Sequence, residues 1–231
     1  MLEPYHPDAP KSRWLNNLKG IVRRRLLLYT GSMSLPEQAA SGLGAIILAA
    51  GDSRRMRQPK ALLSLGGETF LGRWLRILGE ARIGAIRVVL GHDATTIRAH
   101  VELPDRQVVL QPNPEEGMLS SLRLGMDSLP EGLDGLLLCP VDHPRVEAGL
   151  ISSLEAALRP GVVVVPVHDG RRGHPVLFSA ELFAELRTVP LAAGARAVVR
   201  ADPGRVVEVP AAAGVLADID TPADYDSLSR N

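Results

Sequence analysis

Lysine is almost absent from most of this 231-residue chain. Lys60 is the only lysine in residues 41–231, where the other 19 basic side chains are all arginine. Arginine carries a planar fork, whereas lysine is a compact point charge on a flexible stem. Such a charge can hold a phosphate while it reacts. Lys60 is therefore the first candidate for a functional side chain, although chance would also leave one lysine somewhere.

Cysteine, aromatic residues and net charge are scarce as well. The single cysteine, Cys139, excludes a disulfide framework and fits a reducing, cytoplasmic compartment. Aromatic residues make up only 3%, so the core must consist mostly of Leu, Val, Ile and Ala. No apolar run is long enough to span a membrane. Residues 43–231 carry 20 basic and 23 acidic side chains, which argues against a nucleic-acid-binding domain.

The first 42 residues differ from the remainder in charge and pattern. They carry six basic and three acidic side chains, and RRRLLLY at 23–29 has too short an apolar part for a signal peptide. The first strand pattern begins only at Ala45. We expect residues 1–42 to be an extension outside the fold, a working start at Met33, and one domain over 43–231.

From residue 44 onward, apolar runs of strand length alternate with amphipathic runs of helix length. This alternation predicts an α/β fold with a mainly parallel sheet covered on both faces. Strands are expected at 45–50, 86–90, 108–110, 136–139, 162–167, 176–178 and 206–209. Helices are expected at 71–81, 94–101, 118–129, 146–158, 180–187 and 193–200, and after Thr221.

Segments rich in Gly, Pro and polar residues follow the strands, at 51–60, 91–93, 111–121 and 140–144. Loops that leave the carboxyl ends of parallel strands share one sheet edge and line the ligand crevice. We therefore expect Lys60, Asn113, Ser120 and Asp142 to be neighbours.

The first of these loops lacks both the Walker A spacing and the G-x-G-x-x-G pattern. Ala49, Ala50 and Gly51 are small enough for the backbone to approach a ligand, and backbone N–H groups there can bind phosphate oxygens. The arginines at 54, 55 and 57 add charge. For Arg54 and Arg57, a solvated basic loop is an equally good interpretation.

Two aspartates are candidates for a metal site. Asp142 follows an apolar strand and could hold Mg²⁺ against a triphosphate, or it could be a turn aspartate. Near the end, Thr221, Pro222 and Asp224 have the order of an ordinary helix start. That interpretation makes Asp224 structural and leaves Asp220 free to be a second metal ligand.

The segment 111–121 offers Asn113, Gly117 and Ser120 for hydrogen bonds to a nucleobase, although Ser120 and Ser121 could instead cap the following helix. Cys139 lies in an apolar run and is expected to be a buried small side chain. For His174, the favoured interpretation is a hydrogen-bonded structural histidine.

Together these pieces resemble the MobA-like nucleotidyltransferases, and within them the molybdenum cofactor cytidylyltransferase branch. The resemblance covers residues 44–229 in family order. It is carried by LAAGDSRRMRQPKALL at 48–63, NPEEGMLSSLRLG at 113–125, CPVDHP at 139–144, GHPVLF at 173–178 and DIDTPADY at 218–225. Arg55 and Lys60 match the basic residues of the family loop. Arg57 stands where the family usually has Gly, which tolerates backbone angles that Arg does not.

The resemblance implies a Rossmann-like, three-layer α/β/α nucleotidyltransferase fold and Mg²⁺-dependent transfer of CMP from CTP to a molybdopterin-type cofactor, with release of pyrophosphate. Ala50 points to CTP, because the guanylyltransferase branch has LAGG here. A molybdenum-dependent dehydrogenase could receive the product. The implied site comprises Arg55 and Lys60 for catalysis, Asp142 and Asp220 for the metal, and Leu48, Ala49, Ala50, Gly51, Lys60, Asn113, Gly117, Ser120 and Pro140 for the nucleotide. A sugar phosphate or phospholactate-type acceptor, and a non-catalytic cofactor-binding accessory protein, stay open as alternatives.

Overall fold

Alternate residues of the first strand pack on opposite faces of one sheet. In β1 (Ser41–Ala49), Ala45 and Ile47 belong to one buried cluster, whereas Ile46 and Leu48 belong to another. A continuous apolar run of this kind suits a strand that is covered on both sides. The structure is a computed structural model that describes residues 41–228, so the expectations for residues 1–40, including a start at Met33, lie outside the described residues.

The main sheet has eight strands, and seven of them follow the order β10-β7-β9-β6-β1-β4-β5, with β8 paired to β7. Neighbouring strands along this order run parallel, except that β9 is antiparallel to both β6 and β7. The mainly parallel sheet is therefore confirmed. The remaining strands are β4 (Ile83–Leu90), β5 (Val108–Leu110), β6 (Gly135–Pro140), β7 (Val163–His168), β8 (Arg171–Arg172), β9 (Val176–Ser179) and β10 (Val206–Pro210).

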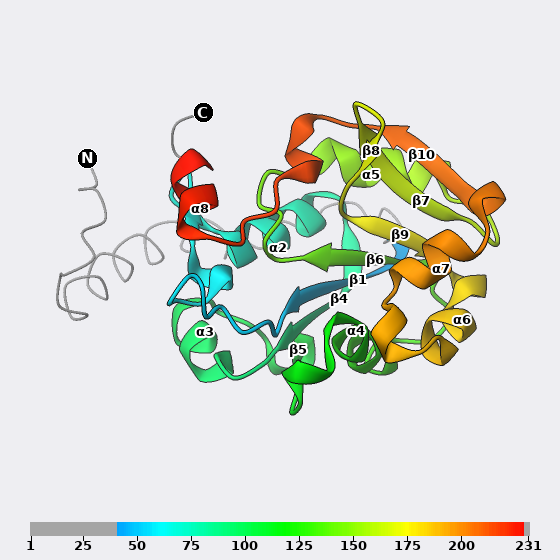
Figure 1. Cartoon of the computed structure of the whole chain (residues 1–231). Helices are drawn as coiled ribbons and strands as arrows, with labels where there is room; N and C mark the ends of the chain where they lie inside the picture. Colours follow the sequence, from blue (N-terminus) through cyan, green and yellow to red (C-terminus); the bar gives the residue numbers. More distant parts are fainter. Residues whose placement is uncertain (1–40, 229–231) are drawn as a thin grey trace, which may run out of the picture. The chain divides into compact units, whose positions relative to one another are not determined.

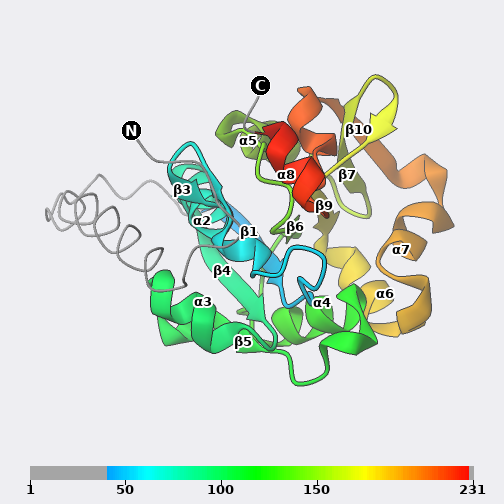
Figure 2. The same ribbon diagram turned by 60° about the vertical axis from the view of Figure 1, so that its left-hand side comes forward.

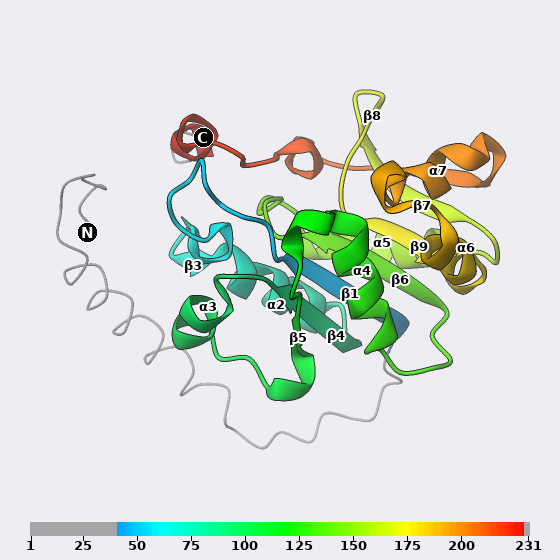
Figure 3. The same cartoon turned by 60° about the horizontal axis from the view of Figure 1, so that its bottom comes forward.

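Helices cover both faces of the sheet and complete three layers (Figure 1). On one face the core takes side chains from α2 (Phe70–Glu80), α3 (Ala94–His100), α5 (Ala148–Ala157) and α8 (Pro222–Leu228). On the other face it takes them from α4 (Met118–Asp127), α6 (Phe183–Thr188) and α7 (Arg196–Ala201). Figure 3 shows α4 in front of β1 and α2 behind it. Within residues 41–228, no helix has the length and apolar character needed to cross a membrane.

The expected strands and helices are present, and the differences have local causes. β1 starts at Ser41 instead of the predicted Ala45. Gly42 and Gly44 interrupt the apolar pattern of the strand, which is why its start was missed. Gly44 packs closely, since a Cβ there would lie only 2.7 Å from Leu133. The small hairpin of β2 (Ser64–Leu65) and β3 (Glu68–Thr69) was not predicted, and neither was β8. Strands of two residues are too short to show a hydrophobic period.

Gly125 allows α4 to pack closely on β1. A Cβ at Gly125 would lie 2.8–3.0 Å from three atoms of the buried Ile46 side chain. We expect Gly125→Ala to lower the free energy of unfolding by about 1 kcal/mol, because overpacking outweighs the gain in helix propensity. Gly79→Ala in α2, where a Cβ would meet nothing within 4 Å, should instead stabilise by about 0.5–1 kcal/mol. Urea unfolding of both variants checks this, and equal effects would contradict the close packing.

Candidate functional site

A cleft opens where the carboxyl ends of β1 and β6 meet the loops that follow them. Its volume is about 240 Å³. Eight of the predicted site residues line it, namely Leu48, Ala49, Ala50, Gly51, Lys60, Gly117, Pro140 and Asp142. The lining also includes Asp93 after β4, Pro114 and Met118, which the sequence did not single out, and Ser121, for which it offered only a capping role. The site therefore occupies the sheet edge that parallel topology predicts.

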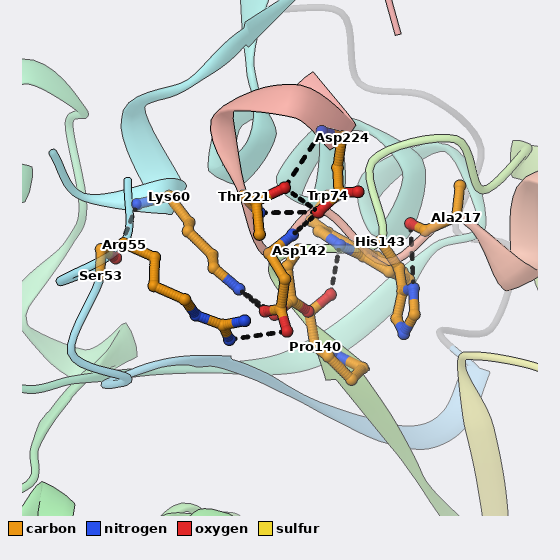
Figure 4. Close-up of polar contacts among 11 residues, drawn as sticks. Ser53, Arg55, Lys60, Trp74, Pro140, Asp142, His143, Ala217, Thr221 and Asp224 are labelled. Carbon is orange, nitrogen blue, oxygen red and sulfur yellow. Dashed lines mark hydrogen bonds and ion pairs between the residues drawn. The ribbon is translucent and has the colours of Figure 1, made fainter. Parts of the chain in front are cut away.

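The ammonium group of Lys60, drawn in Figure 4, binds two carboxylates, and of these only Asp142 lines the cleft. Its Nζ donates to Asp142 Oδ2 at 2.9 Å and to Asp220 Oδ1 at 2.5 Å. Arg55 donates to the other oxygen of Asp220, Oδ2, at 2.8 Å. Only 16% of the Lys60 side chain is exposed, against 65% of Arg55, so Lys60 is the more shielded of the two cations. Four predicted residues from three segments thus form one charged cluster.

The charges in this cluster shift one another's pKa values. Burial alone would lower the pKa of Lys60, but the charge of Asp142 and the hydrogen bonds to both carboxylates raise it above its usual value. The hydrogen bond from Lys60, and then that from Arg55, lower the pKa of Asp220. Lys60 is therefore positively charged and Asp220 negatively charged at neutral pH.

Backbone contacts align the end of β6 with the segment before α8. Ile219 N donates to the carbonyl of Asp142 at 3.0 Å, and His143 Nδ1 contacts the carbonyl of Ala217 at 3.1 Å. On the opposite side, the buried Trp74 donates its indole N–H to the carbonyl of Pro140 at 3.0 Å. These contacts bring Asp142 and Asp220 together, although 78 positions separate them in the sequence.

Two histidines pack together beside the carboxylates. The rings of His143 and His174 stack with centroids 4.7 Å apart. Burial, and then the neighbouring His143, lower the pKa of His174 to about 4, and burial also lowers the pKa of His143. The expectation that His174 is hydrogen-bonded was wrong for Nδ1, which is buried with no hydrogen-bond partner. Stacking on a neutral imidazole is what holds this side chain.

The loop after β1 presents unused backbone donors to the cleft. Within residues 41–228, the N–H groups of Gly51, Asp52 and Ser53 donate to no protein acceptor. Ser53 instead accepts from the backbone N–H of Lys60 through its Oγ at 3.1 Å, which closes the loop. Successive free N–H groups beside a lysine form a cradle for phosphate oxygens. Figure 2 shows this loop, blue to cyan, near α8 in red.

Arg57 adopts a left-handed backbone conformation, with φ of 56°. Such a conformation costs a non-glycine residue about 1–2 kcal/mol. The backbone at residue 57 therefore has a conformation that glycine prefers, and in this chain the exposed Arg57 adopts it. This explains why the family loop usually has Gly at this position.

A buried glutamine organises the segment before α4. Gln111 Nε2 donates to Ser120 Oγ at 3.1 Å and to Ser121 Oγ at 3.2 Å, and Ser120 donates to Glu116 at 2.7 Å. The capping interpretation for the two serines is therefore wrong, because α4 begins after Gly117 without a side-chain cap. Asn113 and Ser120 do not line the cleft, although Pro114 and Ser121 beside them do.

Two structural interpretations are confirmed. Asp224 Oδ2 accepts from Thr221 N at 2.7 Å and from Asp220 N at 3.1 Å, so Asp224 caps α8 and fixes the backbone of Asp220. Cys139 is completely buried, and burial raises the pKa of its thiol, which excludes a reactive thiolate.

A third carboxylate belongs to the cluster. Oxygen atoms of Asp142, Asp218 and Asp220 lie within 4.8 Å of one another. Desolvation of its carboxylate, followed by repulsion from Asp142 and Asp220, raises the pKa of Asp218, although this residue is exposed. Three hard oxygen ligands at this spacing suit a divalent cation such as Mg²⁺ or Mn²⁺. The signal for Asp218 was its place two residues before Asp220.

Neutral His174 makes folding dependent on pH. The folded pKa of about 4 lies below the unfolded value of about 6.5, so the unfolded chain takes up a proton first as the pH falls. We expect metal-free protein to lose about 2–3 kcal/mol of stability between pH 6.5 and pH 4 through this group. His174→Gln should reduce the slope measured by urea unfolding at several pH values, whereas His92→Gln, at an exposed position, should not. Equal slopes in both variants would contradict the burial of a neutral imidazole.

The sequence of the chain matches a family model and several known proteins. The family model described as "MobA-like NTP transferase domain" matches residues 45–206. Nicotine blue oxidoreductase of Paenarthrobacter nicotinovorans is 30% identical, over 68% of this chain and 81% of that protein. A probable molybdenum cofactor guanylyltransferase of Opitutus terrae is 36% identical, over 57% of this chain and 63% of that protein.

Solved structures agree with this assignment. Rv0371c from Mycobacterium tuberculosis H37Rv is 27% identical with a TM-score of 0.75, covering 84% of this chain and all of that one. A manganese complex of the same protein has a TM-score of 0.65 at 26% identity, covering 82% and 98%. The match over residues 45–206 and these likenesses show that the chain belongs to the MobA-like NTP transferase family.

Proposed function

We propose that this protein transfers CMP from CTP to the phosphate of a molybdopterin-type cofactor, with Mg²⁺ as its metal and pyrophosphate as the second product. The observation that carries the proposal is the position of Lys60. Lys60 lines the cleft together with Gly51, Asp52 and Ser53, whose N–H groups have no protein acceptor, and its ammonium group contacts two carboxylates that can hold a metal.

Different residues would have different roles in the transfer reaction. The N–H groups of Gly51, Asp52 and Ser53 would hold phosphate oxygens of the triphosphate, and Lys60 would balance charge on the leaving pyrophosphate. Arg55 would keep Asp220 in place through their ion pair at 2.8 Å. The acceptor phosphate attacks the α-phosphorus in line. The bond between the α-phosphorus and the oxygen that bridges it to the β-phosphorus breaks, and that oxygen leaves as part of pyrophosphate. Catalysis then depends on positioning and charge stabilisation.

A metal completes this arrangement when it is bound. Asp142 and Asp220 are the proposed ligands, and the bound Mg²⁺ would supply charge neutralisation on the phosphoryl oxygens. The backbone contacts that align residues 142 and 219 preorganise these carboxylates, because neither segment can move without breaking the Ile219–Asp142 hydrogen bond.

One feature of the first loop supports a pyrimidine nucleotide. Ala50 carries a methyl group in the lining, where the resemblance associates glycine with the guanylyl branch. The acceptor is proposed from the resemblance, and a molybdenum-dependent dehydrogenase would be the recipient of the dinucleotide cofactor.

Replacing the charged cluster tests its role. We expect Asp142→Asn to remove detectable turnover, because a neutral amide is a poor metal ligand, and Lys60→Arg to lower kcat by about 100-fold, because the fork cannot replace the point charge. Asp226→Asn, at an exposed position on α8, is the matched control and should keep wild-type turnover. Wild-type kcat in Lys60→Arg, with folding confirmed by circular dichroism, would remove Lys60 from the mechanism.

A nucleotide panel tests the substrates. CTP, GTP, ATP and UTP are each incubated with Mg²⁺ and one acceptor, either molybdenum-loaded pterin cofactor or a sugar phosphate. The released pyrophosphate is then measured. We expect release with CTP, and a shift toward GTP in Ala50→Gly. Release only with GTP would contradict the assignment of the base. Release with a sugar phosphate but not with the pterin would contradict the acceptor, and no release with any pair would favour a non-catalytic accessory protein.

A further inference from the structure

Lys60 contacts one carboxylate oxygen of each proposed metal ligand. Its ammonium group binds Asp142 Oδ2 and Asp220 Oδ1, which are carboxylate oxygens of the two proposed metal ligands. An ammonium group and a divalent cation cannot both lie between the same two oxygens. In the protein as described, the lysine therefore takes the place of a cation.

Asp218 differs from its two neighbours in this respect. It belongs to the same cluster, yet among the described residues it forms no ion pair with Lys60, Arg55 or any other cation. Its backbone N–H donates to Leu216, within the segment that the Ile219–Asp142 hydrogen bond aligns. Asp218 is thus the carboxylate that an entering cation meets without displacing a side chain.

We propose that Lys60 and the divalent cation exchange places: the cation enters through Asp218, displaces the Lys60 ammonium from Asp142 and Asp220, and frees it for the phosphate-binding side of the cleft. The proposal rests on the proposed function only in taking these carboxylates as the metal site. It assigns Asp218 as a third ligand and gives Lys60 two positions.

The chemistry of the side chains suits such an exchange. The backbone of Lys60 stays fixed, because its N–H donates to Ser53 Oγ, while its flexible four-carbon stem lets the ammonium group move. Without a metal, the lysine offsets part of the repulsion among three carboxylates. With a metal bound, that compensation is no longer needed, and the lysine charge becomes available to a triphosphate.

The scarcity of lysine makes the exchange directly observable. The chain has three lysines, Lys11, Lys19 and Lys60, so protein labelled with ¹⁵N at the lysine Nζ gives at most three ammonium signals. Lys60→Gln identifies the signal of Lys60. We expect this ammonium to exchange its protons slowly with water in metal-free protein, and at least about tenfold faster once Mg²⁺ saturates the site, because its two carboxylate partners are lost.

Metal affinity gives a second, independent measurement. By calorimetry with Mn²⁺ alone, we expect Asp218→Asn to bind at least about tenfold more weakly than wild type, and Asp226→Asn to bind normally. Lys60→Gln should bind more tightly than wild type, and by a larger factor than Arg55→Gln, because Arg55 contacts only one of the two proposed ligands.

Three results would overturn the exchange: unchanged proton exchange of Lys60 at saturating Mg²⁺, unchanged Mn²⁺ affinity in Asp218→Asn, or no metal binding by nucleotide-free protein. No nucleotide is present in either measurement. A protein that fails the nucleotide panel but passes here would lose its proposed substrates and keep the exchange, so the two failures can be told apart.

Discussion

The ion pairs of Lys60 with Asp142 and Asp220 are the interaction on which the rest of the site depends. They connect the loop after β1, the end of β6 and the segment before α8, which are three separate parts of the chain. Each partner is at least partly shielded, with 16% of Lys60, 25% of Asp142 and 37% of Asp220 exposed. Charges in such a setting interact more strongly than on an open surface.

Much of the surrounding structure serves to hold these three groups in register. The indole of Trp74 binds the carbonyl of Pro140 from the α2 side, and Ile219 binds the carbonyl of Asp142 from the other. Asp224 fixes the amide of Asp220. The stacked histidines fill the space beside them without adding charge, since both are neutral at physiological pH. Apart from the carboxylate of Asp224, the site is thus supported by neutral contacts.

The sequence predicted the layers and the parallel sheet, because both rest on strong local signals. It offered Lys60 as a phosphate-binding residue and Asp142 and Asp220 as metal ligands, with a turn role left open for Asp142. Strands covered on both sides appear as continuous apolar runs, and the carboxyl ends of parallel strands must share an edge. The ion pairs themselves could not be predicted, since they depend on how the segment 211–221 returns to the end of β6. The role of Asp218 was missed for the same reason, and that of Gln111 because its contacts depend on how the segment 111–121 turns from β5 into α4. The only signal for the left-handed backbone of Arg57 was the glycine that the family loop usually has at this position.

Family membership and site geometry make different contributions to the account. Membership in the MobA-like family, together with structural likeness to Rv0371c, establishes the nucleotidyltransferase architecture. The relatives bear names as different as nicotine blue oxidoreductase and molybdenum cofactor guanylyltransferase. The choice of substrate must therefore come from side chains of this chain. In the first loop, the resemblance singles out Ala50 and Arg57 for this comparison.

A crystal structure with a non-hydrolysable CTP analogue and Mn²⁺ tests the central claim most directly. The account predicts an anomalous manganese peak at the carboxylates of Asp142 and Asp220, with the triphosphate along the N–H groups of Gly51–Ser53 and Lys60 Nζ in contact with it. A nucleotide bound away from this loop, or manganese bound elsewhere while Lys60 keeps both ion pairs, would contradict it.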